Sequence, residues 1–268
     1  MQLTTTTLTI ENQIAVVTLN RPAKMNGVNM AMFNELRYLA KKLKSDTSIR
    51  AVIITGAGGN FSAGLDFKAM TSSPLYAFKL LFKWLPGNAN RAQQVSSLWR
   101  KIAVPVIAVI EGYCWGAGMQ IALGCDFRFC HHDAKLAVME SKMGLVPDMA
   151  GTLGMREHLS KDIAMKLTMT SESISAEQAI ALGLVTQVSS TPMDDALDFC
   201  EQIKQKSPDA IAGIKSIYAR FWNASPRTIL AYETYSQVRV AIGKNFAKVQ
   251  QALNKKVAAR FSNRQKFW

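Results

Sequence analysis

The sequence predicts an α/β fold built as a spiral of repeated ββα units, followed by a helical C-terminal region. Three observations lead to this prediction. Between residues 104 and 124 a buried apolar strand stops at a glycine-rich turn and restarts as a short helix. The same order of features occurs 54 residues earlier, where a strand at 52–55 corresponds to the strand at 106–109. Beyond residue 194 the apolar residues recur almost throughout at helical spacing.

The two glycine turns align with each other. Ala63-Gly64 falls on Ala117-Gly118, each within an aromatic-x-Ala-Gly sequence. Repetition of strand, tight turn and helix start is typical of a stacked coil in which each unit covers its neighbour's apolar face. Two imperfect copies also arise by coincidence in α/β proteins, so both interpretations stay open on the repeat alone.

Local patterns define the elements that precede the second turn. Alternating β-branched residues over 8–19 predict a strand pair that turns at Glu11-Asn12-Gln13. Apolar residues at helical spacing predict a helix over 30–43, and a short buried strand follows at 51–55. Residues 72–100 have the pattern of two amphipathic helices around a Pro86-Gly87 break, and their aromatic residues suit either a flap over a cleft or the core.

The second half of the chain begins with a helix at 119–124, then a strand and a loop that carries Glu140 and Asp148. Ser175 and Gln178 resemble a capping box at a helix start. Because helical spacing continues almost throughout beyond residue 194, we divide the chain into a spiral core, residues 1–190, and a helical region, residues 191–268. The further elements that the patterns predict are helices at 161–170 and 176–183, a strand at 184–188, and helices at 194–206, 208–222 and 226–260.

Composition places the chain among globular proteins with a full core. It has 268 residues, of which 49% are hydrophobic, and a mean hydropathy of +0.04. It shows no apolar run of about 18 residues and no signal-peptide pattern, so we expect a cytoplasmic protein without membrane insertion. The four cysteines form no CxxC pair, and His131 and His132 are adjacent, which favours structural thiols and no metal site.

The charge balance is strongly basic, with a net charge of +13 and an isoelectric point near 9.7. This balance allows a nucleic acid, a membrane surface or a polyanionic small molecule as partner. The excess is largest from Ile242 to Trp268, a stretch that contains seven Lys or Arg residues and no acid. These cations suit either a solvated helix face or a tail that contacts phosphate groups.

Several motifs, in the right order from about residue 8 to the C-terminus, resemble the crotonase superfamily, the enoyl-CoA hydratases and isomerases. They are Asn20-Arg21-Pro22 with Asn26 and Asn29, Phe61 to Asp66, Gly112 to Gly118 with Cys125-Asp126, and Gly183-Leu184-Val185. The resemblance implies a crotonase-like spiral, C-terminal helices that form homotrimers, often paired into homohexamers, and an enzyme that acts on an acyl-CoA. Coenzyme A is then part of the thioester substrate, and no other cofactor is implied.

The resemblance also implies an oxyanion hole at Leu65 and Ala117, whose main-chain N–H groups match those that hold the thioester oxygen in the family. Donors held about 3 Å from a developing oxyanion can lower a barrier by roughly 3–4 kcal/mol. A dinucleotide-binding fingerprint at Gly116-x-Gly118 is the competing interpretation. It fails because Ile121 stands where a third Gly or Ala is needed.

The acid and base depart from the best-known hydratases of the family, which use two glutamates. The matching positions here are Gln120 and Glu140. A glutamine takes up no proton at neutral pH, although it can orient a water. Asp148 lies eight residues after Glu140, and this pair resembles the dienoyl-CoA isomerase branch, in which a glutamate and an aspartate move protons along the acyl chain. Two carboxyl groups at one apolar cleft separate in pKa, which suits one as base and one as acid.

Each carboxylate also has a simpler interpretation. Glu140 on its own would be a surface loop acid, and Asp148 would be the N-cap of the following helix. Asp148 also matches the nucleophile of the family's aryl-CoA dehalogenases, but those enzymes carry a tryptophan at the position of Glu140. We therefore expect an enoyl-CoA hydratase or isomerase, with double-bond isomerisation by Glu140 and Asp148 as the alternative to hydration.

The resemblance places the adenine and pantetheine of coenzyme A along the turn from Ser62 to Asp66, with a cation near the Arg-Pro motif at its phosphates. A C-terminal segment would reach the CoA of a neighbouring subunit, which gives the basic tail a polyanion to bind. The matching residues are Ser62, Ala63, Gly64, Asp66 and Gly116 at the turns, Arg21 and Lys24 as the first cations, Arg264 and Lys266 in the tail, and Met70, Trp84 and Trp115 as candidates for the acyl pocket.

A hypothesis from a different class is a basic scaffold that binds RNA with weak or no catalysis, since the superfamily includes an RNA-binding hydratase. It predicts salt-dependent RNA binding that is lost when residues 255–268 are removed. The sequence contains no RNA-binding motif and no aromatic platform, so we favour the acyl-CoA enzyme.

Overall fold

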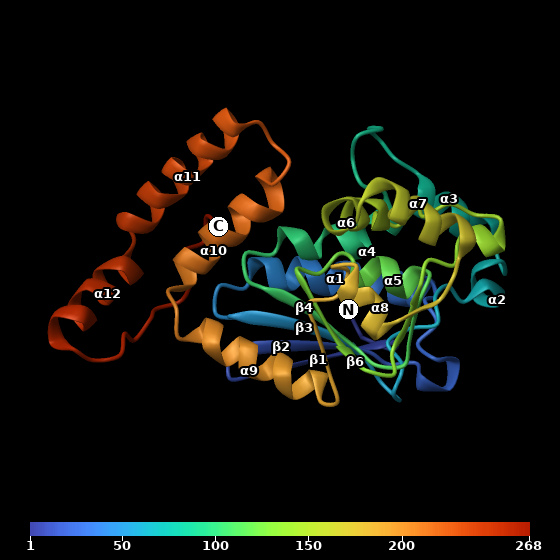
Figure 1. Cartoon of the computed structure of the whole chain (residues 1–268), viewed down its shortest axis with the longest axis horizontal. Coiled ribbons are helices and arrows are strands. Elements are labelled where there is room, and N and C mark those ends of the chain that lie inside the picture. The colour runs from blue at the N-terminus through green and yellow to red at the C-terminus, as the bar shows by residue number, and fades with distance from the viewer.

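The main sheet has six strands in the order β1-β2-β3-β4-β6-β9 and crosses the middle of the molecule (Figure 1). The computed structural model describes residues 1–268. β1 and β2 form an antiparallel pair, and every later pair of neighbours is parallel. The strands are β1 (Thr6–Glu11), β2 (Ile14–Leu19), β3 (Ala51–Gly56), β4 (Val106–Ile110), β6 (Phe127–His131) and β9 (Gln187–Ser189).

A smaller sheet contains β5 (Tyr113–Trp115), β7 (Lys135–Ala137) and β8 (Ile174–Ser175). β5 follows β4 and β7 follows β6, so each of these two turns of the spiral gives one strand to each sheet. The two copies of the sequence repeat stack directly, because Val52 in β3 pairs with Val106 in β4, at the 54-residue spacing of the repeat. This register confirms the predicted α/β spiral and excludes coincidence as the source of the repeat.

Helices cover both faces of the main sheet (Figure 1). Side chains alternate along β3, so Ile54 faces the larger core under α1 and α5, and Ile53 faces the smaller core under α9. No helix combines the length and the apolar character that crossing a bilayer requires. The helices are α1 (Met30–Ser45), α2 (Phe67–Met70), α3 (Pro74–Leu81), α4 (Arg91–Ser97), α5 (Ala117–Ala122), α6 (Gly151–His158), α7 (Lys161–Thr170), α8 (Ala176–Ala181), α9 (Pro192–Lys204), α10 (Pro208–Phe221), α11 (Pro226–Ala241) and α12 (Lys244–Lys255), with short 3-10 turns η1 (Pro22–Lys24), η2 (Trp99–Lys101) and η3 (Ser141–Met143).

The C-terminal region differs from the sequence prediction in one respect. The periodicity predicts one helix over 226–260, but the structure has two, α11 and α12, which project away from the sheet (Figure 1). The helix breaks at Gly243, whose backbone is extended, and a Cβ there would come within 2.2 Å of Gln265 Nε2. α9 lies beyond residue 190 and packs on the sheet, and the division of the chain at that residue stays a prediction.

Two smaller boundaries also differ. α5 begins at Ala117 rather than at Met119, because Gly116, with a φ of +48°, already ends the preceding turn. The strand predicted at 184–188 is β9, which begins only at Gln187. The capping box of Ser175 and Gln178 is present as predicted.

All four cysteines are buried and free, which confirms structural thiols. Burial raises the pKa of Cys125 to about 12, so this thiol stays protonated. The adjacency of His131 and His132 was expected to keep both from facing one metal, but their side chains lie together at the end of β6. The rings of His131 and His132 lie 4.0 Å apart, and with Asp133 they offer three ligand atoms within 4.8 Å of one another.

A buried ion pair ties α10 to the sheet. Lys215 Nζ lies 2.7 Å from Asp126 Oδ2, and it also donates to the main-chain oxygen of Val104 at 2.8 Å. The same carboxylate oxygen accepts from the N–H of Val106, at the start of β4, at 2.7 Å. The carboxylate of Asp126 therefore joins α10 to β4, and both charges keep partners away from water.

We expect Lys215→Met to lower the free energy of unfolding by about 3 kcal/mol, because it leaves the carboxylate of Asp126 without its cation. Urea unfolding followed by circular dichroism measures this change. Lys204→Met is the matched control, since it removes a lysine from a surface pair with Glu201, and it should cost less than about 0.5 kcal/mol. Equal costs for the two substitutions would contradict the anchoring role of Lys215.

Candidate active site

A buried asparagine holds the N-terminal motif against the first glycine turn. Asn26 Nδ2 donates to the main-chain oxygens of Ala57 and Asn60, at 2.8 and 2.7 Å, and Asn26 Oδ1 accepts from the N–H of Arg21 at 2.8 Å. Asn26 also has a positive φ of 54°, which asparagine tolerates better than most residues. The residue type at this position therefore follows from both its backbone and its hydrogen bonds.

The two glycine turns pack so closely that no side chain fits between them. A Cβ on Gly118 would lie 2.6 Å from the Cβ of Ser62, and a Cβ on Gly64 would lie 3.1 Å from the main-chain oxygen of Trp115. Gly64 also has a φ of +100°, a conformation that favours glycine. Ser62 pairs with Cys114 through a parallel bridge, so the main chains of the two turns lie side by side.

The main-chain N–H groups of Leu65, in the first turn, and Ala117, in the second, have no hydrogen-bond partner in the chain. Ala117 is the first residue of α5, where an N–H group has no partner within the helix. A Cβ on Gly64 would lie 3.7 Å from the nitrogen of Ala117, so the two free amides are close together. Both residues line the same cavity, where such donors can bind a carbonyl oxygen or an oxyanion.

This cavity has a volume of about 330 Å³ and a mostly apolar lining. It lies between the two glycine turns, α1, the α3–α4 segment and the loop around η3. A cavity of this size suits a small-molecule ligand or the reactive part of a larger one. Its lining consists of Phe33, Ala63, Gly64, Leu65, Phe67, Leu80, Ala92, Trp115, Gly116, Ala117, Met139, Glu140, Lys142, Met143, Leu145, Asp148 and Met149.

Glu140 is the buried carboxyl group of the cavity, and the residue is only 9% exposed. Its Oε1 accepts from Gln120 Nε2 at 2.6 Å, whereas its Oε2 has no partner in the chain. Burial raises the pKa of Glu140 above its usual value, the hydrogen bond from Gln120 opposes part of this rise, and Asp148 adds to it. One oxygen is thus held in position, and the other is left without a hydrogen-bond partner.

Gln120 is buried behind Glu140 and does not line the cavity. Its Oε1 accepts from the main-chain N–H groups of Met149 and Gly151, at 2.8 and 3.2 Å. These two donors determine which end of the amide is oxygen, so Nε2 faces Glu140. Both acceptor positions of the amide oxygen are used within the chain, and none is left for a water.

Asp148 lies at the cavity mouth, between η3 and α6, with an exposed side chain. Partial desolvation raises the pKa of Asp148. The N-cap of α6 is Ala150, without any side-chain hydrogen bond, so the interpretation of Asp148 as a helix cap is wrong. The interpretation of Glu140 as a surface acid is also wrong, because the residue is buried. The structure brings both carboxyl groups to one cavity.

Arg21 and Asp66 form an ion pair that joins the N-terminal motif to the first turn. Arg21 Nη2 lies 2.9 Å from Asp66 Oδ2, and Arg21 Nη1 donates to the main-chain oxygen of Gly27. Asp66 also caps α2 by accepting from the N–H of Ala69 at 3.1 Å. Lys24, which is exposed and forms no ion pair, is therefore the freer of the two predicted phosphate-binding cations.

Three other predicted binding residues lie outside the cavity. Ser62 is fully buried, and its Oγ donates to the main-chain oxygen of Asn26 at 2.8 Å. Arg264 is buried near the end of α1, where Nη2 donates to the main-chain oxygen of Asp46 at 3.2 Å. Lys266 is exposed. The contact of the last two residues with a neighbouring subunit's ligand stays a prediction.

Of the three candidates for the acyl pocket, only Trp115 lines the cavity. Met70 packs against the core, and Trp84 is 86% exposed. Sequence reasoning missed most of the apolar lining, such as Phe33 on α1 and Leu80 on α3. Their helical spacing predicts a buried face, and a core and a cavity produce the same spacing, so the pattern alone could not separate them.

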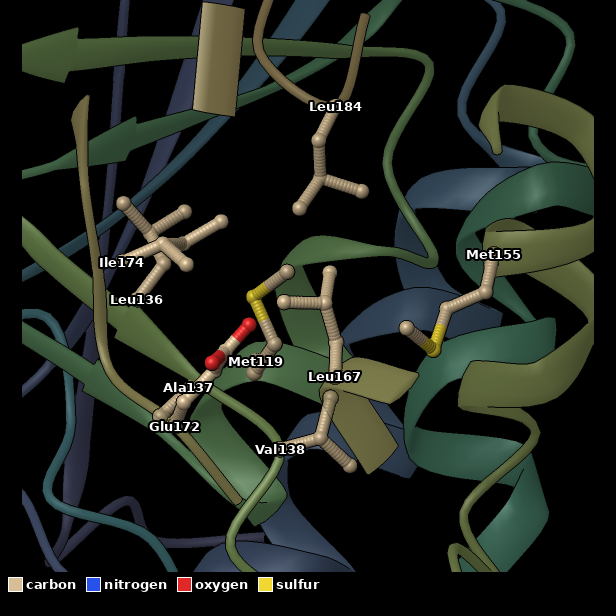
Figure 2. Close-up of a pocket in the computed structure, with 9 residues that line it drawn as sticks. All are labelled: Met119, Leu136, Ala137, Val138, Met155, Leu167, Glu172, Ile174 and Leu184. Atoms are coloured by element: carbon tan, nitrogen blue, oxygen red, sulfur yellow. The ribbon is translucent and has the colours of Figure 1, made fainter. Parts of the chain in front are cut away.

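A second and much smaller cavity lies behind α5, with Met119 at its centre between Leu136 and Leu167 (Figure 2). Its volume is about 10 Å³, room for about one water-sized molecule. The lining is apolar except for Glu172, whose carboxylate pairs with Lys166 Nζ at 3.0 Å. This cavity is a packing gap behind the second glycine turn and offers no chemistry of its own.

Residues 9–264 match the family model described as enoyl-CoA hydratase/isomerase. A carnitinyl-CoA dehydratase from Escherichia coli is 34% identical over 247 residues, which are 90% of this chain and 88% of that protein. A short-chain-enoyl-CoA hydratase from Clostridium acetobutylicum is 31% identical over 240 residues, 87% of this chain and 88% of that protein. The crystal structure of an enoyl-CoA hydratase from Mycobacterium tuberculosis is similar, with a TM-score of 0.85 at 28% identity, and the match covers 96% of this chain and 98% of that one.

Ionisation of Glu140 should destabilise the folded protein, because its pKa is raised above the usual value of 4.5. The cost is absent below the pKa of the unfolded chain and complete above the raised pKa of the folded chain. We therefore expect Glu140→Gln to raise the Tm at pH 8 and to change it little at pH 4. Calorimetry from pH 4 to pH 8 measures the difference.

Glu11→Gln is the control for this experiment, because Glu11 is exposed in β1. It should give no gain in Tm that grows with pH. A loss of stability at pH 8 in Glu140→Gln, or a Tm difference that is constant over the range, would contradict a raised pKa for Glu140.

Proposed function

Because this chain belongs to the enoyl-CoA hydratase/isomerase family, we propose that it acts on unsaturated acyl-CoA thioesters and relocates a double bond through a thioester enolate. One observation carries the proposal. Two free main-chain amides, one buried carboxyl group and a second carboxyl group at the mouth all line the same apolar cavity. This set can hold an enolate oxygen and move a proton on the carbons next to it.

In the proposed reaction the N–H groups of Leu65 and Ala117 donate to the thioester oxygen. Removal of a proton from C2 moves negative charge onto that oxygen, and two donors in an apolar cavity stabilise the charge by roughly 3–4 kcal/mol. The close contact between the turns at Gly64 and Gly118 keeps both donors in place before the substrate arrives. Little reorganisation is then needed during the reaction.

Glu140 is the proposed base. It takes a proton from C2 of a 3-enoyl thioester, which gives a dienolate with charge on the oxygen and on C4. Glu140 or Asp148 returns a proton to C4, and the double bond then lies between C2 and C3, conjugated with the thioester. One proton leaves the substrate and one is added, so no other reactant is consumed. The raised pKa of Glu140 and the free Oε2 both suit this transfer.

Hydration of a 2-enoyl thioester is the second candidate, and the names of the relatives, a dehydratase and a hydratase, favour it. The side chains lend it less support. Gln120 has no group that gives up or takes a proton at neutral pH, and its carbonyl oxygen already accepts from two main-chain amides. A nucleophilic water would depend on Glu140 and Asp148, so the two reactions compete for the same pair of carboxyl groups.

We also propose that the chain assembles as a homotrimer, alone or paired into a hexamer, through its C-terminal helices. Apolar side chains on α11 are exposed in the single chain, among them Leu230, Tyr235 and Val238, which are 62%, 53% and 54% exposed. In this assembly Lys24 and a neighbouring subunit's tail, with Arg264 and Lys266, would lie near the CoA phosphates.

The proposed reaction is tested by incubating the protein with 3-enoyl- and 2-enoyl-CoA esters and following the absorbance of the conjugated thioester. We expect conversion of the 3-enoyl ester. Glu140→Gln should lower kcat by about 10²- to 10⁴-fold, because an amide cannot take up the proton. Glu172→Gln is the matched control, since its carboxylate pairs with Lys166 outside the candidate site, and it should keep full activity.

Heavy water separates the two candidate reactions. Deuterium at C4 without a gain of oxygen supports isomerisation, deuterium at C2 alone supports only enolate formation, and a product with a new hydroxyl at C3 supports hydration. Unchanged turnover in Glu140→Gln would remove Glu140 from either mechanism.

The pH profile tests the role of Gln120. Its hydrogen bond lowers the pKa of Glu140, so Gln120→Met should raise that pKa further. Activity that needs ionised Glu140 is lost as the pH falls through its pKa, and the acid limb of kcat/KM should therefore move to higher pH. A limb that stays in place, or moves to lower pH, would show that Gln120 does not act through Glu140.

A further inference from the structure

Large apolar side chains are exposed together on α3 and the turn that follows it. Six of them, which we call the α3 patch, are each more than half exposed: Leu75 51%, Phe78 62%, Leu81 52%, Phe82 53%, Trp84 86% and Leu85 56%. The rings of Phe78 and Phe82 lie 5.5 Å apart, so the patch is continuous there. A contiguous patch of exposed apolar side chains marks a binding site, whereas apolar side chains scattered singly over a surface need no explanation.

The charges within the segment that carries the α3 patch have one sign. Lys79 is exposed and Lys83 is half-buried, and neither forms an ion pair with an acid. From residue 67 to residue 110 the chain contains six Lys or Arg residues and no Asp or Glu. Interleaved Trp, Phe, Leu and Lys are the residues that occupy the headgroup region of a bilayer, where rings and apolar chains enter the boundary and cations meet phosphates.

The α3 patch lies outside the wall of the main cavity. Leu80, on the inner side of α3, is 7% exposed and lines the cavity, as does Phe67 at the start of α2. α3 sits at the end of the molecule opposite to α11 and α12 (Figure 1). The inner side of this short helix therefore closes the cavity, while its outer side is left to a partner away from the C-terminal helices.

We propose that the α3 patch docks on the surface of an anionic phospholipid bilayer. A headgroup layer supplies phosphates for Lys79 and Lys83 at the same depth as an apolar boundary for the rings. A second copy meeting the first through the same patch would instead bring identical lysines of two chains of charge +13 together, without an acid between them. α3 has eight residues, so it lies on the surface and does not cross it.

This docking is independent of the reaction. One consequence does rest on the proposed function, namely that the docked protein would hold its cavity close to a bilayer in which the hydrocarbon chains of acyl-CoA esters partition.

The test is co-sedimentation of the full chain with vesicles of phosphatidylcholine alone or mixed with phosphatidylglycerol. We expect binding to the anionic vesicles that weakens with added salt, and little binding to the neutral ones. The double variant Phe78→Ser with Trp84→Ser should bind anionic vesicles about tenfold more weakly or worse, because it removes two rings from the boundary. Lys79→Glu with Lys83→Glu should abolish the preference for anionic vesicles.

Matched controls change the same kinds of residue elsewhere. Met169→Ser with Ile180→Ser removes two other exposed apolar side chains, and Lys41→Glu with Lys42→Glu makes the same charge change on α1. Both controls should bind as the parent protein does, and thermal unfolding shows that each variant is folded.

Equal binding to neutral and anionic vesicles, or full binding by the Phe78 and Trp84 double variant, would overturn the proposal. A lower mass of that variant in light scattering, with vesicle binding unchanged, would identify the α3 patch as a contact between copies and would also overturn it. Turnover measured without vesicles separates a failure of docking from a failure of the proposed reaction.

Discussion

The contact between Ser62 and Gly118 sets the positions of the two free amides of the candidate site. No side chain fits at Gly118, so the main chains of the two glycine turns meet directly, and the free amides of Leu65 and Ala117 reach one wall of the cavity. Ser62 suits this position because it is small and its hydroxyl has partners on both sides. Its Oγ donates to the main-chain oxygen of Asn26 and accepts from the N–H of Gly64. A larger residue would separate the turns, and an alanine would leave the main-chain oxygen of Asn26 without this donor.

The same short helix serves both the amide side and the proton side of the site. Ala117 and Gln120 are three residues apart on α5, so they lie on one face of the helix. The position of α5 therefore fixes both the free N–H of Ala117 and the side-chain amide of Gln120 that donates to Glu140. Gln120 extends this control to the loop before α6, because its oxygen also holds the N–H groups of Met149 and Gly151. A shift of the second turn would move the amide and the carboxyl group together, which preserves their relative geometry.

The sequence predicted what depends on local pattern and on repetition. The 54-residue repeat corresponds to the pairing of Val52 with Val106 in neighbouring strands. The carboxyl groups of Glu140 and Asp148, eight residues apart in the sequence, line one cavity. Features that depend on contacts between distant residues were not predictable. Gly243, where the helix breaks, lies against the distant Gln265, and Arg21 forms an ion pair with the distant Asp66. The aromatic residues of α3 were expected in a flap or in the core, because helical spacing does not tell which face meets water.

Glu140 is buried without a cationic partner and with Oε2 free of any hydrogen bond, whereas the buried carboxylate of Glu35 accepts hydrogen bonds at both of its oxygens. The carboxylate of Asp126 is held by Lys215, and that of Asp66 by Arg21. The chain has a net charge of +13, so a shortage of Lys and Arg residues does not explain why none of them pairs with Glu140. A lysine or arginine there would lower the pKa of Glu140, keep the carboxylate ionised and occupy Oε2. A neutral amide from Gln120 orients the carboxyl group through Oε1 alone and leaves the other oxygen able both to take a proton and to return it.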